Sequence, residues 1–333
     1  MGANKYLILI SLQIIFLLIT SVYHAIATRI ETRKYPPPGQ LIDIDGYKLH
    51  LYSAGEGSPT VVFDHSIGSL GWSNYFVFQE LAKTTRVVVC DRAGYGWSET
   101  SPKPRTSEEV VKELHTVLTK AGIESPYILV GDSFGGYTAR LYAHKFPEKV
   151  VGMVLTHAIH EETALNFPLS LKIMAIVFLV GFKTTQIVAT LGIVRLAGLL
   201  GFFEFFKKEL RNFPQEELKR IKLSYYLSKH WEAMYREVRD IKQSSQQMKQ
   251  AGTLGNMPLV VITVSNFLKR SYLTAWLPLR QTDESWKKMQ DELVKLSSNS
   301  KEIIAEKSGH FVWIDEPEVM VQAVRELVAM VRK

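Results

Sequence analysis

The chain has 333 residues, of which 46% are apolar and 22% charged, a composition typical of globular proteins that bury a large core. Its net charge of +7 is spread along the chain, and no basic stripe with interleaved aromatic residues is present, so we expect no nucleic-acid partner. A single cysteine, Cys90, excludes an intramolecular disulfide and any cysteine-rich metal site.

The first feature along the chain is an apolar stretch from Tyr6 to Ala27 that contains no Asp, Glu, Lys or Arg. At about 1.5 Å per residue a helix of this length reaches about 33 Å, enough to cross a hydrocarbon core of about 30 Å. A cleavable signal peptide is the rival interpretation, since Ala25-Ile26-Ala27 fits a cleavage site. The length of the run and the basic residues after it favour an uncleaved, single-pass membrane anchor with the rest of the chain on the cytoplasmic side.

Short apolar runs separated by turn signals predict an α/β fold with a doubly wound, mainly parallel sheet of about eight strands. An Asp-Gly turn at 45–46 joins the first two runs, 41–44 and 47–52, into an antiparallel hairpin. The buried strands are expected at 60–63, 86–90, 127–130, 150–155, 259–264 and 301–305. A last helix is expected from about Glu316 to Val331.

Residues from about 160 to 255 separate two predicted strands and show helical rather than strand patterns. Such an insertion is expected to form a helical cap over the carboxyl ends of the strands. Its apolar residues either pack the cap onto the core, line an apolar substrate pocket or touch the bilayer. A second transmembrane helix is not expected, because Lys172 and Lys183 bracket a run of only ten residues. The predicted organisation is an anchor and flank at 1–34, a first core part at 35–158, the cap at 159–256 and a second core part at 257–333.

The stretch from Tyr127 to Gly136 predicts a strand, a sharp turn and a helix around G-D-S-F-G. This is the setting of a nucleophile elbow, which lifts Ser133 Oγ out of the sheet. Small residues at 131 and 135 permit the tight turn. The amide of Phe134, at the start of the helix, is expected to stabilise an oxyanion, and the amide of Ile67 is the expected second donor.

The neighbouring Asp132 does not fit the nucleophile position, because the small residues would then have to be Val130 and Phe134. This argues against dehalogenase and epoxide-hydrolase chemistry, which needs aspartate at the elbow. The expected base is His310, which directly follows the last strand in S-G-H-F and would take the proton of the serine.

Two parts of the chain resemble the α/β-hydrolase fold family, in particular a bacterial branch of serine hydrolases with an N-terminal membrane anchor and a helical cap. They are the stretch from Arg86 to Glu162, with D-R-A-G-Y-G-W-S, G-D-S-F-G-G, R-L-Y-A and G-M-V-L, and the tail with S-G-H-F and D-E-P. The resemblance implies hydrolysis of an ester, thioester or amide through an acyl-enzyme, without a metal or an organic cofactor. The apolar cap and the anchor favour an acyl or lipid-like substrate.

The third member of the triad departs from the family pattern. This branch often carries aspartate just after the strand that here ends at Leu155, whereas His157 occupies that position in this chain. Glu161 and Glu162 follow four to five residues later and could reach His310 from the start of the cap, and Glu161 is the acid that we expect. Asn266, which follows the strand at 259–264, and Asp283 are the alternatives.

A poor or missing acid predicts a slow enzyme, because losing its charge and its control of the tautomer costs about 10⁴ in kcat. The alternative function is a non-catalytic ligand-binding or scaffold protein on the same fold. A cofactor-free haloperoxidase or a C–C hydrolase uses the same triad and is also left open.

Overall fold

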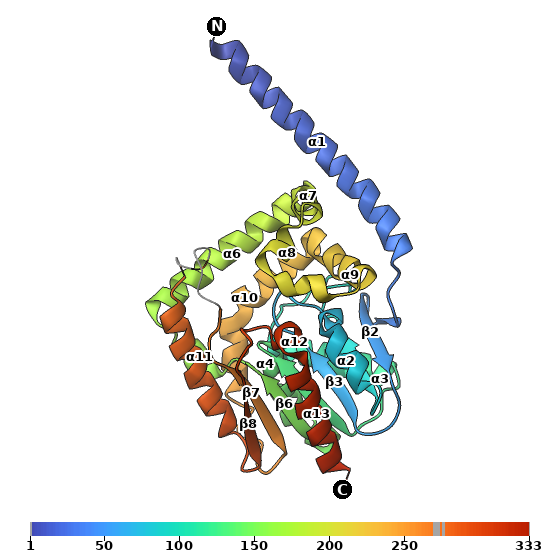
Figure 1. The fold of residues 1–333 in the computed structure, drawn as a ribbon, viewed down its shortest axis with the longest axis vertical. Helices are drawn as coiled ribbons and strands as arrows, with labels where there is room; N and C mark the ends of the chain where they lie inside the picture. The colour runs from blue at the N-terminus through green and yellow to red at the C-terminus, as the bar shows by residue number, and fades with distance from the viewer. Residues whose placement is uncertain (1, 269–273, 275–276, 333) are drawn as a thin grey trace.

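The computed structural model describes residues 2–268, 274 and 277–332, and its core is one eight-stranded sheet (Figure 1). The strands are β1 Gln40–Asp43, β2 Lys48–Ala54, β3 Thr60–Asp64, β4 Val87–Cys90, β5 Tyr127–Asp132, β6 Val150–Thr156, β7 Leu259–Val264 and β8 Ser300–Ala305. They lie in the order β1-β2-β4-β3-β5-β6-β7-β8. The pairs that β2 forms with β1 and β4 are antiparallel, and all the other pairs are parallel. The predicted doubly wound sheet is confirmed.

The hairpin of β1 and β2 turns at the predicted Asp-Gly pair. Asp45 and Gly46 have φ angles of 70° and 107°, the positive values that a tight two-residue hairpin turn needs. The Gly46 N–H also donates to Asp43 Oδ1 at 3.1 Å. The turn therefore sets the antiparallel edge of the sheet.

The parallel strands are buried on both faces, which explains why they are apolar at nearly every position. In β5, Leu129 packs into one core, and its neighbours Ile128 and Val130 pack into the other. The first core is covered by α3 Ser107–Lys120, α4 Gly135–Lys145 and α11 Leu279–Val294. The second is covered by α2 Tyr75–Leu81, α12 Val312–Asp315 and α13 Pro317–Val331.

Six α-helices lie between β6 and β7, as the helical patterns of this segment predict. They are α5 Glu161–Leu165, α6 Leu169–Thr190, α7 Ile193–Leu199, α8 Phe202–Phe206, α9 Gln215–Tyr226 and α10 Ser228–Met248. Figure 1 shows α6 to α9 at one end of the molecule, far from the C-terminus. Arg92 ties this layer to the sheet, because the buried guanidinium binds Glu237 of α10 at 2.8 Å and Asp64 of β3 at 2.7 Å.

The first part of the N-terminal helix α1, Gly2–Lys34, extends beyond the rest of the molecule, whereas its second part lies beside α7 (Figure 1). By length and composition alone, both α1 and α6 are long and apolar enough to cross a membrane. The sequence led us to expect only one such helix. α6 is longer than the predicted ten-residue run because Lys172 and Lys183 lie within the helix instead of ending it.

Candidate active site

Ser133 lies at the sharp turn between β5 and α4, where its φ of 53° falls in the left-handed region. Residues other than glycine seldom adopt this conformation, so the surrounding structure must hold it in place. The Ser133 N–H donates to Thr156 O at 3.0 Å, and Ser133 O accepts from the N–H groups of Gly136 and Ile159. These bonds fix the serine at the carboxyl edge of the sheet, and Asp132 stays in β5, in register with Thr156.

Two glycines permit the close approach of the chain around this turn. A Cβ on Gly131 would lie 2.6 Å from Gly135 O, and a Cβ on Gly135 would lie 2.2 Å from Asp64 O. Both distances are shorter than real contacts, and the atoms that would be met belong to the backbone. A larger residue at Gly131 would therefore force α4 away from β5, one at Gly135 would force α4 away from β3, and either would displace Ser133.

His310 reaches the serine from the loop that follows β8. Its Nε2 lies 3.1 Å from Ser133 Oγ, and its backbone N–H donates to Phe267 O at 2.9 Å. Burial lowers the pKa of His310 to about 3, so the imidazole is neutral at pH 7. A neutral ring that accepts the serine proton on Nε2 must carry its own hydrogen on Nδ1.

His157 faces this second nitrogen of His310, with 2.6 Å between the two Nδ1 atoms. It directly follows β6, its φ of 42° is left-handed, and its N–H donates to Ile262 O at 2.7 Å. Burial and the neighbouring His310 hold the pKa of His157 well below its ordinary value. Because His310 carries the shared hydrogen, a neutral His157 accepts it on a bare Nδ1 and keeps its own hydrogen on Nε2.

Glu161 lies elsewhere, in a bidentate ion pair with Arg140 of α4 at 2.6 and 2.9 Å. Burial alone would raise the pKa of Glu161, but the hydrogen bonds and charge of Arg140 outweigh it and lower the pKa. The structure therefore brings Ser133 and His310 together but directs the carboxylate of Glu161 to Arg140 instead of to His310. The contact that we expected of Glu161 is made by His157.

The two alternative residues lie beside the histidine pair. Asp283 Oδ1 accepts the N–H of Phe267 at 2.8 Å and so supports the loop that holds His310. Asn266 and Asp283 line a hollow of about 210 Å³ together with His157. The sequence had already placed His157 at the acid position. Its contact with His310 was missed because histidine is not the residue type that we expected there.

The two expected oxyanion donors lie at neighbouring strand ends. Phe134 precedes the first residue of α4, where the helix adds partial positive charge, and Ile67 lies in the turn after β3. Among residues 2–268, 274 and 277–332, no hydrogen bond uses the N–H of either residue. Arg92 steadies the Ile67 turn, because its Nη2 donates to Ser66 O at 3.3 Å. Both amides are therefore available to a ligand oxygen.

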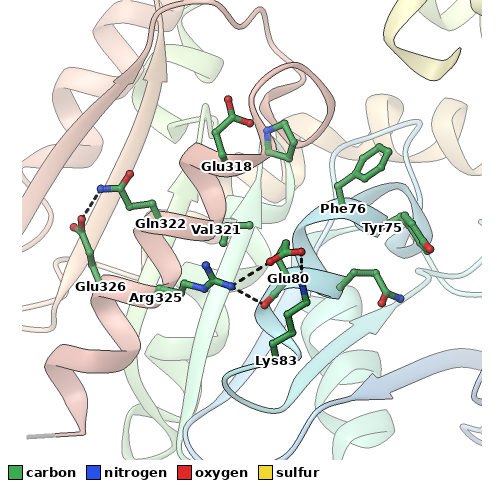
Figure 2. A pocket seen from close by; sticks show the side chains of 11 residues that line it. Tyr75, Phe76, Glu80, Lys83, Glu318, Val321, Gln322, Arg325 and Glu326 are labelled. Atoms are coloured by element: carbon green, nitrogen blue, oxygen red, sulfur yellow. Dashed lines mark hydrogen bonds and ion pairs between the residues drawn. The ribbon is translucent and has the colours of Figure 1, made fainter. Parts of the chain in front are cut away.

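A hollow of about 790 Å³ between α2 and α13 is separate from this arrangement (Figure 2). Figure 2 shows Lys83 and Arg325 turned toward Glu80, and the ion pairs measure 2.5 and 3.4 Å. These side chains are exposed, and the residues that line the hollow include neither Ser133 nor His310. We therefore place the candidate site at the elbow.

Known proteins resemble this chain over the region that contains Ser133 and His310. The model of the alpha/beta hydrolase fold family matches residues 59–317. The uncharacterized protein YbdG of Bacillus subtilis is 29% identical over 153 residues, which cover 44% of this chain and 47% of that protein. A 2-hydroxymuconate semialdehyde hydrolase of Pseudomonas sp. is 36% identical over 123 residues, which cover 36% of this chain and 43% of the relative. This chain thus spans less than half of each of these two relatives.

Among solved structures, the ligand-free epoxide hydrolase CorEH superposes with a TM-score of 0.65 at 17% sequence identity. The superposition covers 88% of this chain and 98% of that one. At this identity the likeness concerns the fold alone.

The position of Glu161 leads to a prediction about stability. Glu161→Gln leaves Arg140 buried without a charged partner, so we expect the free energy of unfolding to fall by about 3 kcal/mol. Urea denaturation of the full chain in detergent measures this loss. Glu162→Gln is the matched control, because Glu162 is exposed and its nearest ion-pair contact, Lys249, lies 3.7 Å away. A Glu161→Gln protein as stable as the parent would contradict the structural role.

Proposed function

Because the chain belongs to the α/β-hydrolase fold family, we propose that it is a serine hydrolase that cleaves an ester, thioester or amide through an acyl-serine intermediate. The single observation that carries the proposal is the 3.1 Å contact between His310 Nε2 and Ser133 Oγ at a turn with positive φ. Serine is a weak nucleophile until a neighbouring base accepts its proton. A buried, neutral His310 supplies that base.

In the proposed reaction, Ser133 Oγ attacks the acyl carbonyl carbon while its proton passes to His310 Nε2. The carbonyl oxygen becomes an oxyanion, which accepts hydrogen bonds from the backbone N–H groups of Phe134 and Ile67. When the carbonyl re-forms, the bond to the leaving group breaks and the leaving group takes the proton from His310. Water then repeats the sequence on the acyl-serine, with His310 again accepting and returning the proton.

We assign to His157 the role of orienting His310, in the place where Glu161 was expected. An acceptor at His310 Nδ1 keeps the tautomer in which Nε2 is free to take the serine proton. A neutral imidazole does this without the negative charge that stabilises the imidazolium in the transition state. The proposed enzyme therefore retains the orientation supplied by a triad acid and lacks part of its electrostatic contribution.

We also propose that α1 is retained as a membrane anchor and that the substrate is an apolar acyl compound. The support for retention is that Arg195 of α7 binds three residues of α1: His24 Nδ1 at 3.1 Å, Thr28 Oγ1 at 2.8 Å and Glu31. Cleavage after Ala27 would take His24 out of this cluster. The support for an apolar substrate is the apolar composition of α1 and α6. The basic residues that follow the apolar part of α1 favour the cytoplasmic side.

The proposal predicts covalent labelling at one serine. We expect the purified full chain in detergent to react with a fluorophosphonate probe, Ser133→Ala to lose the label and His310→Ala to react far more slowly. Ser298→Ala, at an exposed serine, is the control and should label like the parent. A folded parent protein that takes up no label would reject the hydrolase and favour the non-catalytic ligand-binding alternative.

The histidine pair predicts an unusual pH dependence. Catalysis needs neutral His310, so activity is lost only as the pH falls through its lowered pKa, well below the ordinary histidine value of about 6.5. In His157→Asp a carboxylate stabilises the imidazolium. We therefore expect the acidic limb of kcat/KM to move to higher pH and kcat above it to rise by about tenfold.

His157→Asn is the matched control for this change. Asparagine and aspartate both tolerate the left-handed φ of 42° at this position, but only aspartate brings a charge. Hydrolysis of a p-nitrophenyl ester across the pH range measures both variants. Equal acidic limbs in His157→Asp and His157→Asn would argue against the contact between position 157 and His310.

A further inference from the structure

We propose that the outer surface of α6 to α8 is a membrane-docking face that lies within the interfacial layer of a lipid bilayer. We define this outer cap face by Ile173, Ile176 and Val180 of α6, Leu200, and Phe205 and Phe206 of α8. All six side chains are exposed although all six are apolar. The inference rests on the proposed anchor and goes beyond the hydrolase reaction.

α6 has two different sides. Toward the protein it packs on α10, where the rings of Phe182 and Trp231 lie 6.4 Å apart. Away from the protein, Ile176 and Val180 are 60% and 63% exposed, four residues apart on one side of the helix. Because α6 lies along α10, it is bound to the cap and does not cross the bilayer as an independent span. A large exposed apolar face on a bound helix is typical of an interaction site.

The segment of α7 and α8 also carries exposed apolar side chains. α7 contacts both α6 and α8, so the three helices form one connected layer. Leu200, between α7 and α8, is 88% exposed, and Phe205 is 61% exposed. Aromatic and leucine side chains on a face of this kind are typical of helices that lie in the plane of the membrane interface.

The contact with α1 identifies the bilayer as the partner of this face. Gly192, just before α7, lies so close to α1 that a Cβ there would be 2.5 Å from Thr20 O. The fully buried Arg195 then binds the next turns of α1. The outer cap face is therefore attached to the same helix that is proposed to enter the membrane, and Figure 1 shows α7 alongside α1.

Length sets how deep the cap must lie. The part of the apolar stretch before Thr20, residues 6–19, reaches only about 21 Å at about 1.5 Å per residue. A hydrocarbon core of about 30 Å is filled only if the residues after Thr20 also enter it, by about 9 Å. Those residues lie against α7, so the cap enters with them. This depth matches the 5–10 Å by which interfacial amphipathic helices are immersed.

The charges on α6 fit this orientation. Lys172 and Lys183 are the charged residues of the helix, and both are exposed. Lys183 Nζ lies against α10, 5.4 Å from the centre of the Tyr235 ring, so the lysine that flanks the apolar face is Lys172, one turn before Ile176. Such a lysine extends its ammonium group into the headgroup layer while its methylene stem stays in the apolar region. We therefore expect the outer cap face to prefer bilayers that contain anionic lipids.

Fluorescence quenching in vesicles tests the proposal on the full chain. Ile176→Cys and Phe205→Cys are labelled with bimane, which the buried Cys90 should not take up, and are reconstituted in phosphatidylcholine–phosphatidylglycerol vesicles. Lipids with brominated acyl chains should reduce the emission of both labels about twofold, because both would lie at the acyl-chain boundary. Met330→Cys, exposed on α13 far from the cap, is the matched control and should not be quenched.

Leu12→Cys, in the middle of the proposed span, separates the two possible failures. Quenching at Leu12→Cys without quenching at Ile176→Cys and Phe205→Cys would overturn the docking face while leaving the anchor in place. No quenching at any position would overturn both. A blue-shifted emission at Ile176→Cys that brominated lipid does not reduce would mean that a protein surface, such as a second copy of the chain, covers the face, and would also reject the proposal.

Discussion

The left-handed turn at Ser133 is the constraint on which the rest of the site depends. A serine holds a positive φ only where its surroundings leave no relaxed alternative. Here they consist of backbone from three elements: Thr156 O at the end of β6, and Gly131 and Gly135, whose missing side chains let β5, α4 and β3 approach. The parallel sheet thus brings the carboxyl ends of β5, β6 and β8 together. The nucleophile, the base and its partner follow these three strands.

The contact between His157 and His310 gives this site its particular electrostatics. In a triad with an acid, one carboxylate both fixes the tautomer of the base and stabilises its positive charge. A buried pair of neutral imidazoles separates the two effects, since only the first remains. The effect that is lost is the stabilisation of positively charged His310. Each unit by which a carboxylate would raise the pKa of His310 corresponds to about 1.4 kcal/mol of this stabilisation. The carboxylate that we expected to serve as the acid, Glu161, forms an ion pair with Arg140 instead.

The sequence predicts features that depend on local pattern. The eight strands follow from short apolar runs, and the elbow follows from small residues on either side of one serine. The partner of His310 depends instead on how two loops meet across 153 residues of sequence, and no local pattern specifies that His157 would be turned toward it. α6 was underestimated for a related reason. Its two lysines were treated as ends, but a helix continues past a lysine that can reach solvent from an exposed side.

The hydrogen between the two imidazoles is the most direct test of the proposed site. Proton NMR of the ¹⁵N-histidine-labelled full chain in detergent should show one strongly downfield imidazole N–H. This proton lies in a short hydrogen bond, because His310 Nδ1 and His157 Nδ1 are 2.6 Å apart. We expect the resonance to be present in the parent and absent from His157→Ala. A resonance that persists in a folded His157→Ala protein would mean that a group other than His157 orients His310.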